Sequence, residues 1–276
     1  MTKRLSRLSK TDRQARIVAE LAASSSLRVN KLSQRLSVST ETVRRDLAEL
    51  AELGRINRTY GGAIRSVPAE PAVAVREGLM TAERKRIAEV AAQLVESEDI
   101  LMIGGGSTTH HLARCLAKTH NGLTVITHSF SVAMAISTNL THKVIMLPGQ
   151  YDGREDIVYG PETMEALQRF HANKAYLGAS GLTVEGPNDA SVGPGMTYGM
   201  MMQRAGHTMI VADHTKFDRP SLTIYGNWSL STTLITDIQP KGRLAAALLQ
   251  AGASVIEAPA DEAEALSPSG EILTRV

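Results

Sequence analysis

The sequence predicts an α/β protein in two parts: a small N-terminal domain of helices ending in a hairpin, and a larger domain built on a mostly parallel sheet. Charge divides the chain at the same place. Residues 1–66 carry 14 Lys and Arg against 6 Asp and Glu, whereas residues 67–276 carry 16 against 22. Apolar residues recur at helical spacing in the first part, and short apolar runs alternate with helical patterns in the second. Two prolines, Pro68 and Pro71, indicate a linker between the parts.

The composition of the whole chain narrows the class of protein. Its 276 residues are 43% hydrophobic and 21% charged, which is enough apolar content for a folded core. The single cysteine, Cys115, excludes a disulfide framework and a cysteine-based zinc site. No apolar run is long enough to cross a bilayer, and the basic N-terminus lacks the apolar stretch of a signal peptide. We therefore expect a cytoplasmic protein with no membrane partner.

The elements of the first part follow one another closely. A helix is expected from Asp12, where Ile17, Val18 and Leu21 share a face, to the break at 24–26. A second helix fits Val29–Leu36, and a third runs from about Thr40 to Leu53, where Gly54 is a C-cap signal. Residues 55–65 read as two short strands around a Gly-Gly turn. This order is that of a winged helix-turn-helix domain over residues 1–66.

The second part alternates between strands and helices, which predicts a mostly parallel sheet covered by helices on both faces. After a linker at 67–81, the domain spans 82–258 and is followed by a solvated tail at 259–276. Helices are expected at 82–95, 108–116, 131–138 and 242–249, and strands at 99–103, 123–127, 143–147, 174–177, 208–212, 233–235 and 253–256.

The third helix carries the residues expected to contact DNA. In a helix-turn-helix, the second helix of the motif enters the major groove with its N-terminal residues at the base edges. Arginine can bind guanine or grip the phosphate backbone, and Asp46 can pair with an arginine to orient it. A solvated basic face is the alternative interpretation, but the surplus of positive charge favours DNA. The expected contacts are Ser39, Thr40, Thr42, Arg44 and Arg45 of the helix, and Arg55 and Arg58 of the wing.

A glycine-rich turn follows the strand at 99–103 and opens a helix with Ser107, Thr108 and Thr109. Amides at a helix N-terminus can hold an anion. No lysine follows the glycines as in a Walker A loop, and Thr109 breaks the strict G-x-G-x-x-G pattern. A small phosphate is therefore favoured over a nucleotide. The alternative is a tight turn capped by a hydroxyl side chain.

Polar loops also follow other strands of the predicted sheet. Ligands of open α/β sheets bind beyond the carboxyl ends of the strands, so these loops can converge on one site. They are 127–129, 148–150 and 213–217, the last of which offers the cation of Lys216.

The motifs together resemble those of the DeoR family of bacterial transcriptional regulators. The first part contains S-x-x-T-V-R-R-D-L and R-x-x-G-G-A patterns, and the second contains G-G-G-S-T-T, T-V-I-T-H-S, L-P-G-Q, A-Y-L-G-A-S-G-L and V-A-D-H-T-K-F. The resemblance covers about residues 12–257. It implies operator binding, usually repression of a sugar-catabolism operon, and an effector domain with the fold of ribose-5-phosphate isomerase. The implied ligand is a phosphorylated sugar or polyol held by Gly106, Ser107, Thr108, Thr109, Thr127, Ser129, Gly149, Asp213 and Lys216. Gly105, His128 and Gln150 lie in the same loops and complete the expected effector site.

Four positions depart from the family pattern. Gly104 and Asn173 stand where the family usually has Asp, His128 where it has Asn, and Gln150 where it has a second Gly. We expect these departures to cluster at strand ends and to alter the effector chemistry.

The leading hypothesis is a ligand-responsive repressor that binds operator DNA as a homodimer or homotetramer, without catalysis, cofactor or metal. The eight histidines show no metal-ligand spacing. The alternative is a sugar-phosphate isomerase with a regulatory DNA-binding head, for which Asp213 is the one carboxylate at a strand end that could act as a base. Nonspecific DNA binding by the head is a third interpretation.

Overall fold

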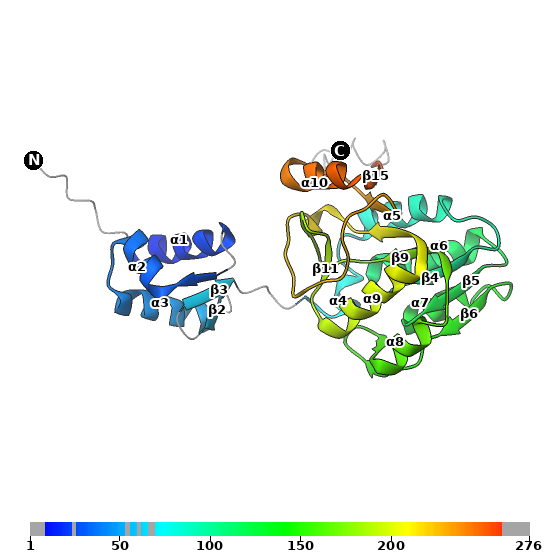
Figure 1. Ribbon diagram of the computed structural model, residues 1–276, viewed down its shortest axis with the longest axis horizontal. Coiled ribbons are helices and arrows are strands. Elements are labelled where there is room, and N and C mark those ends of the chain that lie inside the picture. Colours follow the sequence, from blue (N-terminus) through cyan, green and yellow to red (C-terminus); the bar gives the residue numbers. More distant parts are fainter. Residues whose placement is uncertain (1–8, 24–25, 53–55, 60–61, 66–69, 261–276) are drawn as a thin grey trace, which may run out of the picture. The chain divides into compact units, whose positions relative to one another are not determined.

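The computed structural model describes residues 9–23, 26–52, 56–59, 62–65 and 70–260, and the chain divides into two compact units, residues 1–70 and 71–276 (Figure 1). Arg55, expected to contact DNA, lies outside the described residues, as do positions 261–276 of the expected tail.

The N-terminal unit is a winged helix-turn-helix domain, as the sequence predicts. Its helices enclose a core of Ile17, Leu27, Val29, Leu32, Leu36, Val43, Leu47 and Leu50. One further strand was not expected: β1 pairs antiparallel with β3, which also pairs with β2. The elements are α1 (Lys10–Ala23), β1 (Ser26–Arg28), α2 (Val29–Leu36), α3 (Thr40–Glu52), β2 (Ile56–Thr59) and β3 (Gly62–Arg65).

The C-terminal unit is built on a seven-stranded sheet in the order β15-β14-β12-β9-β4-β5-β6, with every neighbouring pair parallel. This confirms the predicted α/β class. The strands are β4 (Ile100–Ile103), β5 (Thr124–Thr127), β6 (Lys143–Met146), β9 (Ala172–Leu177), β12 (Ala205–Val211), β14 (Thr232–Thr236) and β15 (Ser254–Glu257).

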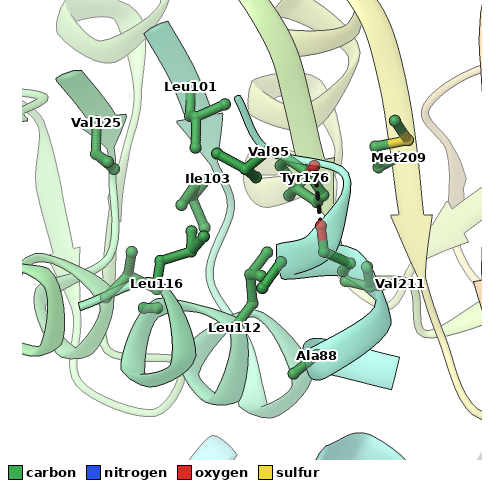
Figure 2. Packing of buried hydrophobic residues seen from close by; sticks show 14 of the residues in the cluster. Ala88, Val95, Leu101, Ile103, Leu112, Leu116, Val125, Tyr176, Met209 and Val211 are labelled. Atoms are coloured by element: carbon green, nitrogen blue, oxygen red, sulfur yellow. Dashed lines mark hydrogen bonds between the residues drawn. The ribbon is translucent and has the colours of Figure 1, made fainter. Parts of the chain in front are cut away.

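Helices cover both faces of the sheet, because alternate strand residues point to opposite sides. Leu101 and Ile103 of β4 pack under α5, α6 and α7, whereas Met102 packs under α8, α9 and α10. Figure 2 shows the first of these cores, in which the Tyr176 hydroxyl donates to the Ala91 carbonyl at 3.2 Å. The helices are α5 (Thr81–Gln93), α6 (Ser107–Thr119), α7 (Phe130–Ile136), α8 (Pro161–Leu167), α9 (Val192–Arg204) and α10 (Gly242–Ala251).

Short elements that the sequence analysis did not anticipate lie around the sheet. A hairpin joins β7 (Gln150–Asp152) to β8 (Ile157–Tyr159), and a small antiparallel sheet has the order β10-β11-β13. Its strands are β10 (Gly181–Leu182), β11 (Pro187–Asp189) and β13 (Thr223–Ile224).

The interval 67–81, expected as a linker, overlaps the C-terminal unit. It contains the short helix α4 (Val73–Arg76), in which Val73 and Arg76 are buried. The Val73 N–H donates to the Arg154 carbonyl in the β7–β8 turn at 3.1 Å, so residues from about 71 onward pack on this unit.

Candidate functional sites

The start of α3 is formed by a hydroxyl cap. Ser39 precedes the helix, and its Oγ accepts the Thr42 N–H at 3.1 Å and lies 2.9 Å from the Thr42 hydroxyl. Such a cap satisfies N–H groups that the first turn of a helix leaves unpaired. Ser39 is exposed, and Thr40 and Thr42 are half-buried. These three predicted contacts therefore lie together at the helix end that the sequence analysis assigned to DNA.

Two arginines extend the same surface of α3. Arg44 is exposed, with Nη1 3.6 Å from Glu41 Oε2, a separation at which a surface pair contributes little. Arg45 is exposed and lines a groove of about 540 Å³ together with Ser39 and Thr42. Arg58 lies in β2.

An ion pair that the sequence analysis left incomplete fixes the orientation of α3. Asp46 is buried and binds Arg13 of α1 through both oxygens, at 2.5 Å to Nε and 2.9 Å to Nη2. Lys10 and Gln14 of α1 also bind Glu49, at 2.7 and 2.8 Å. Asp46 therefore pairs with an arginine, as the sequence suggested. The partner belongs to another helix, so the pair holds α1 against α3.

In the C-terminal unit, the glycine-rich turn lies where β4 ends and α6 begins. Gly106 has a φ of +115°, a conformation that favours glycine. The residues that follow it, 107–109, form the first turn of α6, whose N–H groups have no acceptor within the helix. The Thr109 hydroxyl donates to the Gly106 carbonyl at 2.9 Å. We call residues Gly106–Thr109 the α6 turn.

A buried cation that the sequence analysis missed lies beside the α6 turn. The Arg84 side chain, from the first turns of α5, is 5% exposed. It donates to Ser107 Oγ at 2.8 Å, to Asp213 Oδ2 at 3.1 Å and to the Arg76 carbonyl. Arg84 therefore joins two predicted effector residues, Ser107 and Asp213, that are far apart in the sequence.

The environment of Asp213 keeps its carboxylate charged. Burial alone would raise the pKa of Asp213, but the hydrogen bond from Thr215 and the positive charges of Arg84 and Lys216 hold it below its usual value. Thr215 binds Oδ1 through its hydroxyl and its N–H, and Arg84 binds Oδ2. Both oxygens are thus occupied within the protein, and Lys216 is buried nearby.

The loop after β5 uses its predicted ligand residues for internal contacts. The Thr127 hydroxyl donates to the Ile103 carbonyl at 2.7 Å, and Ser129 Oγ accepts the Val132 N–H at 3.4 Å as the N-cap of α7. His128 is fully buried, and its Nε2 accepts the Gly105 N–H at 3.1 Å while Nδ1 faces the Val158 carbonyl at 2.9 Å. Burial lowers the pKa of His128 to about 4, so the ring is neutral at pH 7.

The third predicted loop forms the start of the β7–β8 hairpin. Gly149 has a φ of +150°, and a Cβ at this position would lie 2.3 Å from Thr163 Oγ1, so the close approach requires glycine. Gln150 is exposed in β7. The hairpin is bound to the β5 loop, because the Val158 N–H donates to the His128 carbonyl at 2.8 Å. The two predicted loops are therefore adjacent.

The departure at Gly104 has a steric explanation in this structure. A Cβ at position 104 would lie 2.7 Å from Cε1 of Tyr198 in α9 and 3.2 Å from Cδ2 of Leu177. The Tyr198 hydroxyl donates to the Gly105 carbonyl at 2.8 Å, and its ring contacts His128 edge-on with centroids 5.5 Å apart. Tyr198 thus fills space beside both glycines. The sequence analysis had no periodic signal that would identify it.

Asn173 lies at a strand end, as expected, but at the amino end of its strand and not beside the ligand loops. This residue is the second of β9, and its Oδ1 accepts the N–H of Ile100, the first residue of β4, at 2.8 Å. Because the strands are parallel, their amino ends lie at the sheet edge opposite the loops that follow β4 and β5.

A separate groove of about 810 Å³ runs between α5, α6 and α7. His110 and His111 line it, together with Lys85, Ala88, Glu89, Arg114, Cys115, Lys118, Ser131, Met134, Ala135 and Thr138. None of the predicted effector residues belongs to it. Among the described residues, no group of three or more His, Cys, Asp or Glu side chains could hold a metal ion, and no helix is long and apolar enough to cross a membrane.

Both parts of the chain match known protein domains. Residues 13–67 match the DeoR-like helix-turn-helix domain, and residues 80–238 match the DeoR C-terminal sensor domain. The chain is 30% identical over 254 residues to the HTH-type transcriptional repressor CsqR of Escherichia coli (strain K12), which covers 91% of this chain and 97% of the relative. It is 30% identical to the glycerol-3-phosphate regulon repressor of the same organism, over 76% of this chain and 84% of the relative.

A third relative is the lactose phosphotransferase system repressor of Streptococcus mutans serotype c, 31% identical over 79% of this chain and 88% of the relative. Among solved structures, a D-ribose-5-phosphate isomerase in complex with phospho-erythronic acid superimposes with a TM-score of 0.37 at 15% identity, over 49% of this chain and 52% of the isomerase. A similarity this low supports no conclusion about shared chemistry.

Proposed function

Because the chain belongs to the DeoR family of transcriptional regulators, we propose that it represses an operon for sugar or polyol catabolism under the control of a phosphorylated sugar. The DNA-binding surface is the start of α3, and the effector site is centred on the α6 turn. The observation that carries the effector assignment is the contact of the buried Arg84 guanidinium with Ser107, since it supplies a cation at unpaired helix N–H groups.

On DNA, α3 enters the major groove with Ser39, Thr40 and Thr42 at its leading end. Arg44 and Arg45 contact bases or phosphates, and the wing arginines Arg55 and Arg58 neutralise the backbone. The cap between Ser39 and Thr42 and the Arg13–Asp46 pair support this assignment, because they fix the helix that must be presented. One such domain reads a half-site, so the protein acts as a homodimer or homotetramer on a symmetric operator in the cytoplasm.

In the effector site, the phosphate of the ligand is held by the N–H groups of the α6 turn, with Arg84 and Lys216 supplying positive charge. The loops at 127–129 and 149–150 border the part of the site that faces the sugar. Because the side chains of Thr127, His128 and Ser129 are occupied by internal hydrogen bonds, this loop shapes the site more than it binds the ligand.

The arrangement favours ligand binding over sugar-phosphate isomerisation. An isomerase needs a carboxylate base that can reach the substrate carbons. Both oxygens of Asp213 are engaged by Thr215 and Arg84, and both ring nitrogens of His128 are engaged by the backbone. For His128, accepting a substrate proton would require loss of the buried contact with the Gly105 N–H.

Operator recognition can be tested with a duplex selected from a random library by the wild-type protein. We expect one selected sequence with twofold symmetry and an affinity that falls steeply with salt. Arg45→Ala should reduce binding to it, whereas Arg169→Ala, in the exposed pair with Glu165 on α8, should not. Selection of no sequence would contradict the assignment and favour nonspecific binding.

The effector site can be tested by thermal shift with inorganic phosphate, glycerol 3-phosphate and hexose phosphates. A ligand that binds only the folded state raises the unfolding temperature. Thr108→Ala combined with Lys216→Ala should abolish the shift and leave operator binding intact. Thr119→Ala, at the other end of α6, is the matched control and should retain the shift. An unchanged shift in the double variant would show that the ligand binds elsewhere.

A further inference from the structure

Arg84 contacts more than the effector site. The same Nη1 that donates to Ser107 Oγ at 2.8 Å also donates to the carbonyl of Arg76, the last residue of α4. A guanidinium offers five N–H donors in a fixed planar fork. Both hydrogens of Nη1 are engaged, one by Ser107 and one by the Arg76 carbonyl. An anion bound at the α6 turn attracts this same guanidinium, and so acts on the group that holds the carboxyl end of α4.

Arg76 in turn holds the start of the C-terminal unit. Its Nη1 donates to the Pro71 carbonyl at 2.7 Å, and its two terminal nitrogens bind the Glu155 carboxylate at 3.1 and 2.7 Å. The Arg76 side chain is 10% exposed, so these contacts are largely shielded from water. Pro71 is the first residue of the C-terminal unit, directly after the DNA-binding unit in the sequence.

The β7–β8 hairpin, which begins in the third predicted ligand loop, also contacts α4. Glu155 lies in the turn of the β7–β8 hairpin, and the carbonyl of its neighbour Arg154 accepts the Val73 N–H at 3.1 Å. The next residue, Asp156, binds the Ser131 N–H of α7 at 2.8 Å. The four-residue helix α4 is thus held on one side by Arg84, beside the α6 turn, and on the other by the hairpin that begins at Gln150.

We propose that Arg84 and Arg76 form a relay that transmits occupancy of the α6 turn to Pro71 and so to the DNA-binding unit. This proposal rests on the effector site proposed above. When phosphate draws the Arg84 guanidinium toward the α6 turn, the Arg76 carbonyl loses its donor and α4 shifts against the hairpin. The contact between Arg76 and Pro71 then changes, and with it the attachment of the DNA-binding unit.

The relay predicts a coupling free energy between ligand binding and operator binding, which can be measured. A ligand can shift an equilibrium only by its difference in affinity for the two arrangements. The ratio of operator dissociation constants with and without ligand measures this coupling, which is typically about 5- to 150-fold in allosteric proteins. A relay residue should lower the ratio while leaving each separate affinity nearly unchanged.

The decisive variant is Arg76→Lys in the full chain. Lysine keeps the charge and can pair with Glu155, but it lacks the fork needed to bind Pro71 and both carboxylate oxygens together. The second variant, Glu155→Gln, weakens the same contacts from the hairpin. The control is Arg169→Lys, in the exposed pair that Arg169, two residues after α8, forms with Glu165. Operator binding is measured by fluorescence anisotropy with whichever of inorganic phosphate, glycerol 3-phosphate and the hexose phosphates affects the wild type most.

We expect Arg76→Lys and Glu155→Gln to bring the coupling ratio to within about twofold of 1, whereas Arg169→Lys keeps the wild-type ratio. Ligand affinity and ligand-free operator affinity should each change less than about threefold in all three variants. A full coupling ratio in both Arg76→Lys and Glu155→Gln would overturn the relay and leave the proposed function intact. If the wild type responds to none of the phosphates, the proposed function itself fails, and the relay with it.

Hydrogen exchange gives a second measurement that does not depend on DNA. The N–H groups of Val75, Arg76 and Glu77 form the hydrogen bonds of α4. The same phosphate probe should change exchange in a peptide covering 71–80 by at least about threefold in the wild type, and not in Arg76→Lys. An exchange rate in this peptide that stays the same when the ligand is bound would also overturn the relay.

Discussion

The buried ring of His128 predicts a specific loss of stability in mild acid. Its Nε2 accepts the Gly105 N–H, so the proton of the neutral ring lies on Nδ1, which donates to the Val158 carbonyl. Burial lowers the pKa of His128 to about 4 in the folded chain, against about 6.5 for an unfolded histidine. Between about pH 4 and pH 6.5, the unfolded chain therefore binds a proton at His128 that the folded chain does not bind.

The size of the effect follows from these two pKa values. Because the folded pKa is the lower one, stability falls as the pH drops through 6.5 and stops falling once the pH is below about 4. Linkage gives a loss of about 2 kcal/mol in the free energy of unfolding between pH 7 and pH 5. At pH 5 the folded chain must also keep the ring neutral, or lose the acceptor of the Gly105 N–H.

The assay is urea unfolding at pH 7 and pH 5, followed by fluorescence of Trp228, the single tryptophan and a buried residue of the C-terminal unit. His128→Gln cannot be protonated, so it should lose about 2 kcal/mol less than the wild type between the two pH values. Burial also lowers the pKa of His111, His142 and His207, but these contributions are common to both proteins and cancel.

The reasoning is refuted if wild type and His128→Gln lose the same free energy between pH 7 and pH 5, whatever their stability at pH 7.

Three further predictions concern single contacts. Gly104→Asp, which restores the residue usual in the family, should destabilise the chain by about 1–3 kcal/mol in thermal unfolding, because its Cβ would lie 2.7 Å from Tyr198. Adding Tyr198→Ala should recover part of this loss. No recovery would exclude Tyr198 as the obstacle. Arg45→Ala should cost about 1–3 kcal/mol of binding to the selected operator and little on random DNA, and equal losses on both would indicate a phosphate contact. Asp46→Ala should destabilise the N-terminal unit by about 3–5 kcal/mol in circular dichroism melting, because Arg13 would remain largely buried without its partner; a loss below 1 kcal/mol would show that the pair is effectively solvated.

Local patterns in the sequence predicted the helices and strands that have a clear periodicity of their own. The helix expected at Val29–Leu36 has those bounds in the structure, and the strand expected at 99–103 is Ile100–Ile103. The three-residue strand β1 was missed because it exists only through pairing with β3, more than thirty residues later in the chain. No local window contains that information.

Helix α9 was missed because its composition opposes a helix. It contains Gly193, Pro194, Gly195 and Gly199, all of which are poor helix formers. Close packing explains the glycines, since a Cβ at position 193 would lie 2.4 Å from the Tyr159 ring and one at position 199 would lie 3.0 Å from the Tyr225 carbonyl. Tertiary contacts thus compensate for the low helix propensity.

The candidate sites follow the same division. Residue order predicts the loops after β4, β5, β6 and β12 and a helix that begins near Thr40, and the structure has these segments at those positions. Arg84 could not be assigned, because its partner Asp213 is 129 positions away and a charged residue early in a helix is usually solvated. The contact of Arg13 with Asp46 could not be assigned either, because it joins two helices that only the fold brings together.

The residues that depart from the family pattern near the α6 turn are therefore not independent of one another. Tyr198 takes the space that a side chain at position 104 would need, and Ile157 does the same at position 105, where a Cβ would lie 2.4 Å from its Cγ2. The two polar backbone groups of Gly105 are then bound by His128 and Tyr198. The ring of Tyr198 thus occupies the space that a side chain at position 104 would need. The donors of the α6 turn remain, so we expect ligand affinity to depend more on the phosphate than on the configuration of the sugar.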